Sequence, residues 1–231
     1  MNLGPVAVRA LVALTQAPSF ESMELIIEID SLVSRAVVFE ENIKPLNLER
    51  IKASTTLLKE QYSLSKEAES IYDWTRANEF LISNLATNDS LNEEIVLGIY
   101  RKLASGFADL RSEGVQGGNC LYPEASSLPE LWKRFWCFFG EHRGSHPIVR
   151  ASIVYQWMVT LHFFSDGNGR LSRLAADWVL LKDSYPPISF PNDASAFISA
   201  LDEDACFTVD DAIVRICDGI KNSLGILSKQ V

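Results

Sequence analysis

Apolar residues recur at spacings of three and four along most of the chain, which places them on one face of an α-helix. By this criterion we expect helices over residues 21–42, 48–59, 65–84, 92–110, 128–141 and about 208–227. Two more helices are expected in the middle of the chain, where the apolar positions are Ala151, Val154, Met158 and Leu161, and then Leu171, Leu174, Trp178 and Leu181. Helices that each bury one face must pack together, so the pattern predicts an all-α bundle.

The helical pattern has one glycine-rich interruption, at residues 114–122. Gly114, Gly117 and Gly118 surround Val115 and Gln116 there, which is typical of a short β-hairpin. On composition alone, an ordinary surface loop is favoured over a hairpin with a function.

The two central helices are joined by a short polar loop. His162 ends the first helix, residues 166–169 form the loop, and Arg170 and Arg173 lie in the first turn of the second helix. That turn carries unpaired N–H groups and a partial positive charge, so two arginines on one face are unfavourable there unless an anion binds beside them. Gly167 and Gly169 flank Asn168 and allow successive N–H groups to point into one concavity, which suits a phosphate.

Two further residues of this segment fit phosphate chemistry. Asp166 beside a phosphate is a natural ligand for Mg²⁺, which binds through few carboxylates and the phosphate's own oxygens. His162 could accept a proton from an incoming hydroxyl group. These residues predict a site for nucleotidyl or phosphoryl transfer. On spacing alone, a plain helix–loop–helix connection with a capping Asp166 explains them about as well.

Other glycine-rich or acidic motifs are excluded by position. An EF-hand that began at Asp166 would need a ligand and a glycine where Arg170 and Leu171 stand. There is no phosphate-binding G-x-x-x-x-G-K-[S/T] segment, and the glycines follow a helix instead of the strand that a dinucleotide fingerprint requires.

The same segment carries a resemblance to a known family. The run His162-x-Phe164-x-Asp166-Gly167-Asn168-Gly169-Arg170-x-x-Arg173 resembles the Fic-domain signature H-x-F-x-[D/E]-G-N-G-R-x-x-R at every fixed position, with Phe163 where the family usually has proline. The resemblance extends upstream to residues 111–117 and to Tyr122-Pro123, which look like the family's flap. Downstream it includes residues 185–188, Tyr-Pro-Pro-Ile.

The resemblance implies a helical Fic fold with a small β-hairpin flap and the activity of a protein adenylyltransferase. Such an enzyme transfers AMP from ATP to a Ser, Thr or Tyr hydroxyl of a target protein, with Mg²⁺ as cofactor. The family roles match this sequence as follows: His162 is the base, Asp166 holds the metal, Gly167, Asn168, Gly169, Arg170 and Arg173 bind phosphate, and Val115, Gln116 and Gly117 position the target.

The resemblance leaves three alternatives open. Close relatives transfer another phosphate-containing group, such as UMP, phosphate or phosphocholine, and such relatives also remove AMP. A non-catalytic Fic-like binding module is the third alternative, and the intact His162 and Asp166 argue against it.

The end of the first predicted helix resembles an inhibitory motif of the family, [S/T]-x-x-x-E-[G/N]. Glu41-Asn42 matches its last two letters, although Val37 stands where Ser or Thr is expected. Carboxylates at a helix C-terminus are disfavoured by the helix dipole. The resemblance implies that Glu41, or Glu40 in its place, pairs with Arg173 in an autoinhibited state. A solvated helix end is the simpler alternative.

Length, composition and charge limit the number of domains and the kinds of partner that we expect. The chain has 231 residues, of which 47% are hydrophobic, so we expect a single domain over residues 1–231. The resemblance places the candidate inhibitory helix at about 20–45 and the Fic core at about 91–201. A net charge of −9 argues against nucleic acid as a partner, and no apolar run is long enough to cross a membrane. A homodimer is compatible with the sequence.

Cysteine and histidine spacing does not indicate a structural metal. The four cysteines lack C-x-x-C spacing, which favours reduced thiols and a cytoplasmic location. His142 and His146 are four residues apart, but Gly144 and Pro147 interrupt the helix that a metal pair would need, so no metal is expected there.

Overall fold

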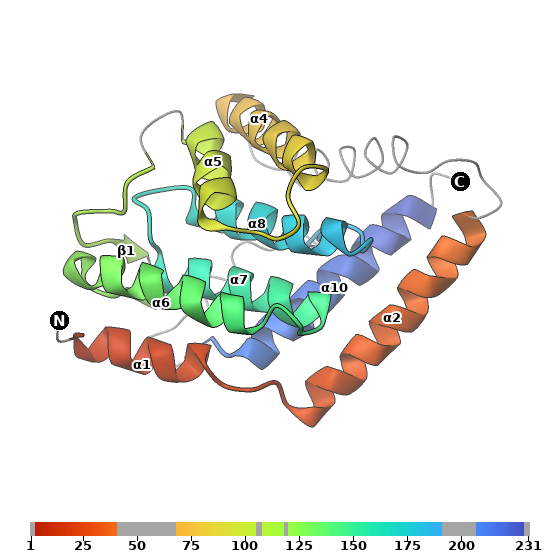
Figure 1. Ribbon diagram of the computed structural model, residues 1–231, viewed down its shortest axis with the longest axis horizontal. Helices are drawn as coiled ribbons and strands as arrows, with labels where there is room; N and C mark the ends of the chain where they lie inside the picture. The colour runs from red at the N-terminus through yellow and green to blue at the C-terminus, as the bar shows by residue number, and fades with distance from the viewer. Residues whose placement is uncertain (1–2, 41–67, 105–107, 118–119, 191–206, 229–231) are drawn as a thin grey trace.

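The computed structural model describes residues 3–40, 68–104, 108–117, 120–190 and 207–228, and it confirms the predicted helical bundle (Figure 1). The α-helices are α1 (Pro5–Leu14), α2 (Phe20–Glu40), α4 (Ala68–Leu85), α5 (Glu93–Leu103), α6 (Leu128–Glu141), α7 (Pro147–Leu161), α8 (Asn168–Lys182) and α10 (Val209–Ser228). A short 3₁₀ helix, η1 (Ala125–Ser127), precedes α6. None of the described helices is long and apolar enough to cross a membrane.

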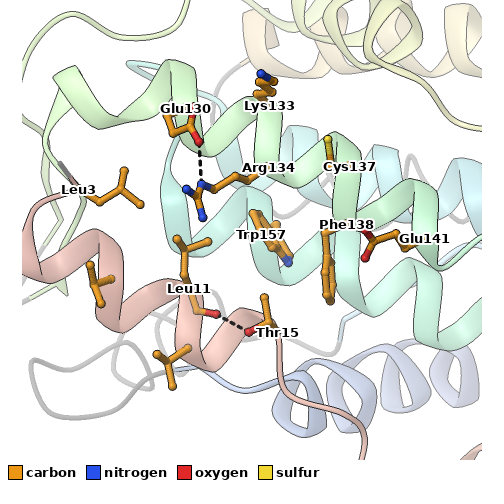
Figure 2. Close-up of a pocket in the computed structure, with 12 residues that line it drawn as sticks. Leu3, Leu11, Thr15, Glu130, Lys133, Arg134, Cys137, Phe138, Glu141 and Trp157 are labelled. Carbon is orange, nitrogen blue, oxygen red and sulfur yellow. Dashed lines mark hydrogen bonds and ion pairs between the residues drawn. The ribbon is translucent and has the colours of Figure 1, made fainter. Parts of the chain in front are cut away.

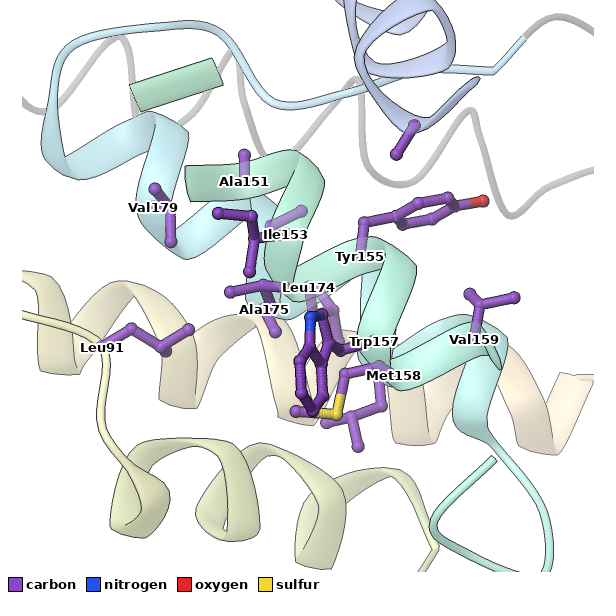
Figure 3. Packing of buried hydrophobic residues seen from close by; sticks show 14 of the residues in the cluster. Leu91, Ala151, Ile153, Tyr155, Trp157, Met158, Val159, Leu174, Ala175 and Val179 are labelled. Atoms are coloured by element: carbon purple, nitrogen blue, oxygen red, sulfur yellow. The ribbon is translucent and has the colours of Figure 1, made fainter. Parts of the chain in front are cut away.

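Helix α7 forms the centre of the bundle. It packs against α8, α10, α6 and α1, so nearly all of its side chains are buried, as expected for a helix that is apolar on every side. Figure 3 shows Trp157 and Met158 of α7 close to Leu174 and Ala175 of α8. This close packing fixes the ends of α7 and α8, and with them the loop that joins the two helices.

Helix α2 is attached to the end of the α7–α8 pair that lies opposite the loop joining these two helices. It packs along α10 through buried Ile26, Ile29 and Val33. The Asp30 carboxylate accepts a hydrogen bond from the Tyr185 hydroxyl at 2.6 Å and lies 3.2 Å from His146 Nε2. His146 caps the start of α7, and Tyr185 follows α8, so this joint lies about 22 Å, the length of α7, from the loop between the helices.

Two strands form the small sheet in the described part of the chain. β1 (Gln116–Gly117) pairs antiparallel with β2 (Cys120–Leu121), so that Gln116 lies opposite Leu121 and Gly117 opposite Cys120. The glycine-rich segment at residues 114–122 thus contains two paired two-residue strands at the position of the predicted flap.

The observed helices differ from the predicted ones in two places, the end of α5 and the additional helix α1. The helix predicted over 92–110 ends at Leu103. At Arg111 the chain is instead attached to the loop after α7, because the Arg111 amide donates to the Phe163 carbonyl at 2.9 Å. Helix α1 was not predicted, and residues 48–59, predicted to be helical, lie outside the described residues.

A pocket of about 650 Å³ lies between α1, α6 and α7 (Figure 2). Leu11, Phe138 and Trp157 give it apolar walls, and Arg134 lies beside it, bonded to Glu130 at 2.8 Å. None of its lining residues belongs to the loop between α7 and α8, so the pocket is separate from that loop.

Candidate active site

Helix α7 ends at Leu161, and the next residue, His162, caps it with a left-handed backbone of φ 49° and ψ 59°. The His162 amide still bonds to the Met158 carbonyl at 3.3 Å, as in a left-handed helix cap. This conformation is costly for a residue with a side chain, by about 1–2 kcal/mol, and persists only where the surroundings hold it. The left-handed backbone makes His162 a candidate functional position.

The loop after His162 is closed by the side chain of Asn168. Its Oδ1 atom accepts the Phe164 amide at 3.0 Å, and its Nδ2 atom donates to the Phe164 carbonyl at 2.6 Å. Gly167, at φ 76°, supplies the turn into α8. The buried side-chain amide of Asn168 thus holds the loop backbone, and phosphate binding by this residue stays a prediction.

Aromatic side chains of α5 and α6 pack against the loop on its buried side. Phe163 and Phe164 are fully buried and anchor the loop in the core. Tyr100 of α5 stacks on Phe164 with ring centroids 3.9 Å apart, and Trp132 of α6 meets Phe163 edge-on at 4.8 Å. The loop thus rests on α5 and α6 as well as on its own two helices.

Exposed Asp166 and partly buried Arg170 form a polar pair at the site. The Asp166 carboxylate accepts the Gly167 amide at 2.6 Å and lies 3.2 Å from Arg170 Nη2. The Asp166 side chain is 89% exposed, so this ion pair contributes little stability and the carboxylate is accessible. An accessible carboxylate beside a helix N-terminus fits Mg²⁺ brought in by a phosphate. Within the described ranges, no three His, Cys, Asp or Glu side chains gather as a protein-only metal site.

The first turn of α8 provides amides beside that carboxylate. Helix α8 begins at Asn168, and its first main-chain bond in this turn runs from the Leu171 amide to the Gly167 carbonyl. The amides of Asn168, Gly169 and Arg170 precede that bond and have no acceptor within the helix. They are suited to binding an anion, with the dipole of α8 adding to the attraction.

His162 is neutral near pH 7. Burial and the Arg111 guanidinium lower its pKa from 6.5 to about 4, while Asp166 opposes the shift. The ring of Tyr122, which follows β2, lies 4.3 Å from the His162 ring. A neutral imidazole can accept a proton, so the structure gives His162 the protonation state that a general base needs.

Arg173 lies one turn further along α8, partly buried and close to the fully buried Asp177. Burial raises the pKa of Asp177 to about 8, against the attraction of Arg173. The Asp177 Oδ1 atom accepts the Ile188 amide at 2.7 Å, which ties the Tyr-Pro-Pro-Ile segment to α8.

The remaining predicted site residues divide into two groups. Val115 is partly buried, and Gln116 and Gly117 form β1, so the predicted flap lies on the segment that leads into the site. Glu41 lies outside the described residues. The two other histidines have structural partners, because His142 Nδ1 lies 2.9 Å from the Phe138 carbonyl and His146 lies beside Asp30.

Sequence reasoning missed the roles of four residues around the loop: Tyr100, Arg111, Tyr122 and Asp177. Arg111 and Tyr122 were included in the flap resemblance without a role. Asp177 had a detectable signal, since a carboxylate is rare on the buried face of an apolar helix.

Comparison with known proteins agrees with this geometry. Residues 90–180 match the model of the Fic/DOC family. The protein adenylyltransferase Fic of Drosophila mojavensis is 33% identical over 98 residues, which are 42% of this chain and 19% of that protein. The chain therefore spans about a fifth of the length of the curated relatives it matches.

Solved structures share the fold over nearly the whole chain. A structure of an IbpAFic2 variant in complex with adenylylated Cdc42 superposes with a TM-score of 0.69 and 17% identity, covering 94% of this chain and 75% of that one. A Fic family protein from Desulfovibrio desulfuricans gives a TM-score of 0.63 at 18% identity, covering 94% and 77%. At this level of identity the likeness concerns the fold.

Proposed function

Because this chain carries a Fic domain, we propose that it is a protein adenylyltransferase, which transfers AMP from ATP to a hydroxyl side chain of a target protein. The observation that carries the proposal is the neutral, left-handed His162 next to an accessible carboxylate and a helix N-terminus. These three features are the base, the metal ligand and the phosphate site that such a transfer requires.

In the proposed reaction, the target hydroxyl oxygen attacks the α-phosphorus of ATP while His162 accepts the hydroxyl proton. A new P–O bond forms, the bond between the α-phosphorus and the bridging oxygen breaks, and pyrophosphate leaves with its electron pair. His162 then releases its proton to water. Mg²⁺, when bound at Asp166, neutralises negative charge on the phosphate oxygens.

The other residues of the site act on charge and position. Amides at the start of α8, together with Arg170 and Arg173, are directed at negative charge on the phosphates. The edge of β1 offers main-chain groups to an extended target segment, which would align a hydroxyl with His162 and demand little of the target sequence.

The proposal is tested by labelling with α-³²P-ATP and γ-³²P-ATP in parallel, with Mg²⁺, in lysate and on the protein itself. We expect label on protein from the α position only, and its loss in His162→Ala with ATP affinity retained. His142→Ala is the matched control, because it removes another histidine outside the site. Equal transfer by His162→Ala would refute the assigned base.

The alternatives predict other outcomes of the same experiment. Label from the γ position would indicate a kinase-like reaction, and transfer from UTP or a phosphocholine donor would change the donor assignment. Release of label from a pre-adenylylated target would indicate removal of AMP. Binding of ATP without any transfer would indicate a binding module.

We also propose, from the sequence motif alone, that Glu41 inhibits the transfer reaction. Glu41→Gly is then expected to increase α-label transfer, because the partner of Arg173 would be removed. Glu21→Gly, a change of the same type near the start of α2, is the control.

A further inference from the structure

We propose that Arg111 is a positioning residue that fixes the place of the β1–β2 hairpin relative to His162. The inference deepens the proposed adenylyl transfer, on which it rests. It concerns how a target hydroxyl, carried by the hairpin, is kept in line with the base.

The Arg111 guanidinium bonds to three separate segments of the chain. Nε donates to the His162 carbonyl at 2.7 Å, and Nη1 donates to the Glu113 carbonyl at 2.8 Å. Nη2 donates to the Pro123 carbonyl at 2.5 Å. Glu113 precedes β1 and Pro123 follows β2, so one planar group joins both ends of the hairpin to the residue that caps α7.

Arg111 is also held through its backbone. Its amide donates to the Phe163 carbonyl at 2.9 Å, next to the carbonyl that its side chain binds. Substitutions of the side chain leave this main-chain bond in place. The chain can therefore keep its path in a variant while the guanidinium contacts are lost.

The Arg111 guanidinium is buried, so losing its hydrogen bonds would be costly. Arg111 is only 6% exposed, and burial lowers its pKa. The partners that the structure describes for the guanidinium are main-chain carbonyls. A buried cation is costly unless its donors are satisfied, and lysine cannot match the fixed fork of an arginine. The residue type thus fits three acceptors in fixed directions.

The arrangement has a direct consequence for the base. His162 has a left-handed backbone, and the Arg111 side chain donates to its carbonyl oxygen. Without the guanidinium, the His162 backbone should no longer be held in its left-handed conformation. Glu113 and Pro123, at the two ends of the hairpin, should also become more mobile. Misplacement of reacting groups by about 1 Å costs on the order of a hundredfold in rate.

The test compares Arg111→Lys and Arg111→Met with wild type, and uses Arg134→Lys, an exposed arginine on α6, as the control. We expect kcat for target labelling to fall by about tenfold or more in both Arg111 variants, with the Kd for ATP within about twofold of wild type. Thermal melts report folded protein. Transfer within twofold of wild type in Arg111→Lys would refute the proposal.

A pH profile separates positioning from a general loss of structure. Arg111 and Asp166 are the charged groups that act on His162, and the Tyr122 ring lies against it. Arg111→Met removes the cation, so the acidic limb of the rate profile should move to higher pH than in Arg111→Lys. Equal losses of transfer, ATP binding and folded protein, without this shift, would show a merely structural role and overturn the proposal.

A second measurement is independent of catalysis. The chain has three histidines, so the His162 imidazole can be followed by NMR titration. Hydrogen exchange at residues 113–123 reports the hairpin. Faster exchange there with a raised His162 pKa in Arg111→Met supports the proposal even if wild type transfers no label, which would refute only the proposed function. Unchanged exchange and titration would refute the coupling.

Discussion

His162 shows how burial sets the protonation state of a single side chain. Its pKa falls from 6.5 to about 4 because burial and Arg111 disfavour the cation. A downward shift keeps the imidazole neutral until the pH approaches 4. We therefore expect the single-turnover transfer rate to stay level from about pH 8 to about pH 5, whereas an unperturbed histidine would lose activity near 6.5.

The measurement is a rapid-quench series with saturating ATP, with circular dichroism at each pH to verify folding. A rate that halves near pH 6.5 in folded protein would contradict the burial argument. His142→Ala, which leaves the site intact, should show the same profile as wild type.

Asp177 illustrates the opposite shift. Complete burial raises its pKa from 3.8 to about 8, so the folded state favours the protonated acid. This contribution to stability is complete below the unfolded-state pKa and is lost as the pH rises toward the folded-state value. Wild type should lose about 2 kcal/mol of unfolding free energy between about pH 6 and about pH 8 from this group.

Asp177→Asn should remove most of that pH dependence, because the amide cannot ionise and its oxygen still accepts the Ile188 amide. Urea denaturation of both proteins at the two pH values checks the prediction. Parallel losses in wild type and variant would show that Asp177 is not the titrating group.

At the scale of elements, Gly98 controls how closely α5 approaches α4. A Cβ atom at this position would lie 2.3 Å from Cζ and 2.5 Å from Cε1 of Phe80. Gly98→Ala should therefore force the helices apart and lower the unfolding free energy by about 1–3 kcal/mol. Because α5 also carries Tyr100 against Phe164, transfer should fall as well.

Gly140→Ala on α6 is the matched control, since no atom lies within 4 Å of its added Cβ. Its stability should be unchanged or slightly higher, as alanine is the better helix former. Urea denaturation of the two variants measures the difference. Equal stabilities would show that Phe80 moves aside without cost.

These elements also show what the sequence can predict. Residues 128–141 were predicted as a helix with the bounds that α6 has, because the apolar stripe there is complete. The loop from His162 to Arg173 was found because its residues are adjacent along the chain. The family resemblance then gave the fold.

What the sequence missed depends on long-range contacts. Arg111 is 51 positions before His162, and a lone arginine in a polar segment gives no sign of three buried carbonyl acceptors. The helix predicted to continue to Leu110 stops at Leu103, because contacts with the α7–α8 loop override the apolar spacing. Phosphate binding by Asn168 stays a prediction, and only the folded loop shows that its side-chain amide bonds to the Phe164 backbone.

At the scale of the whole molecule, α7 and α8 separate two regions. One end of the pair carries the His162 loop, and the other carries the Asp30–His146–Tyr185 joint that docks α2. In Figure 1, α2 runs along α10 on the side of the molecule away from β1. Stability of the α2 joint and chemistry at the loop should therefore be separable.

Tyr185→Phe tests this separation. It removes the hydroxyl that donates to Asp30, and a hydrogen bond to a charged group contributes about 1.5–3 kcal/mol, less where it is partly exposed. We expect the unfolding free energy to fall by about 1 kcal/mol. Helix α2 should nevertheless stay docked, because Ile26, Ile29 and Val33 remain buried.

The proposed AMP transfer by folded Tyr185→Phe should then match wild type in kcat and in KM for ATP, since the joint lies about 22 Å from His162. Urea denaturation and α-³²P-ATP labelling on the same preparation give both quantities. An increased transfer rate would mean that docking of α2 restrains the active site, as an inhibitory role of Glu41 would require. Combining Tyr185→Phe with Glu41→Gly then identifies the origin of the restraint, because two changes that relieve the same restraint do not add.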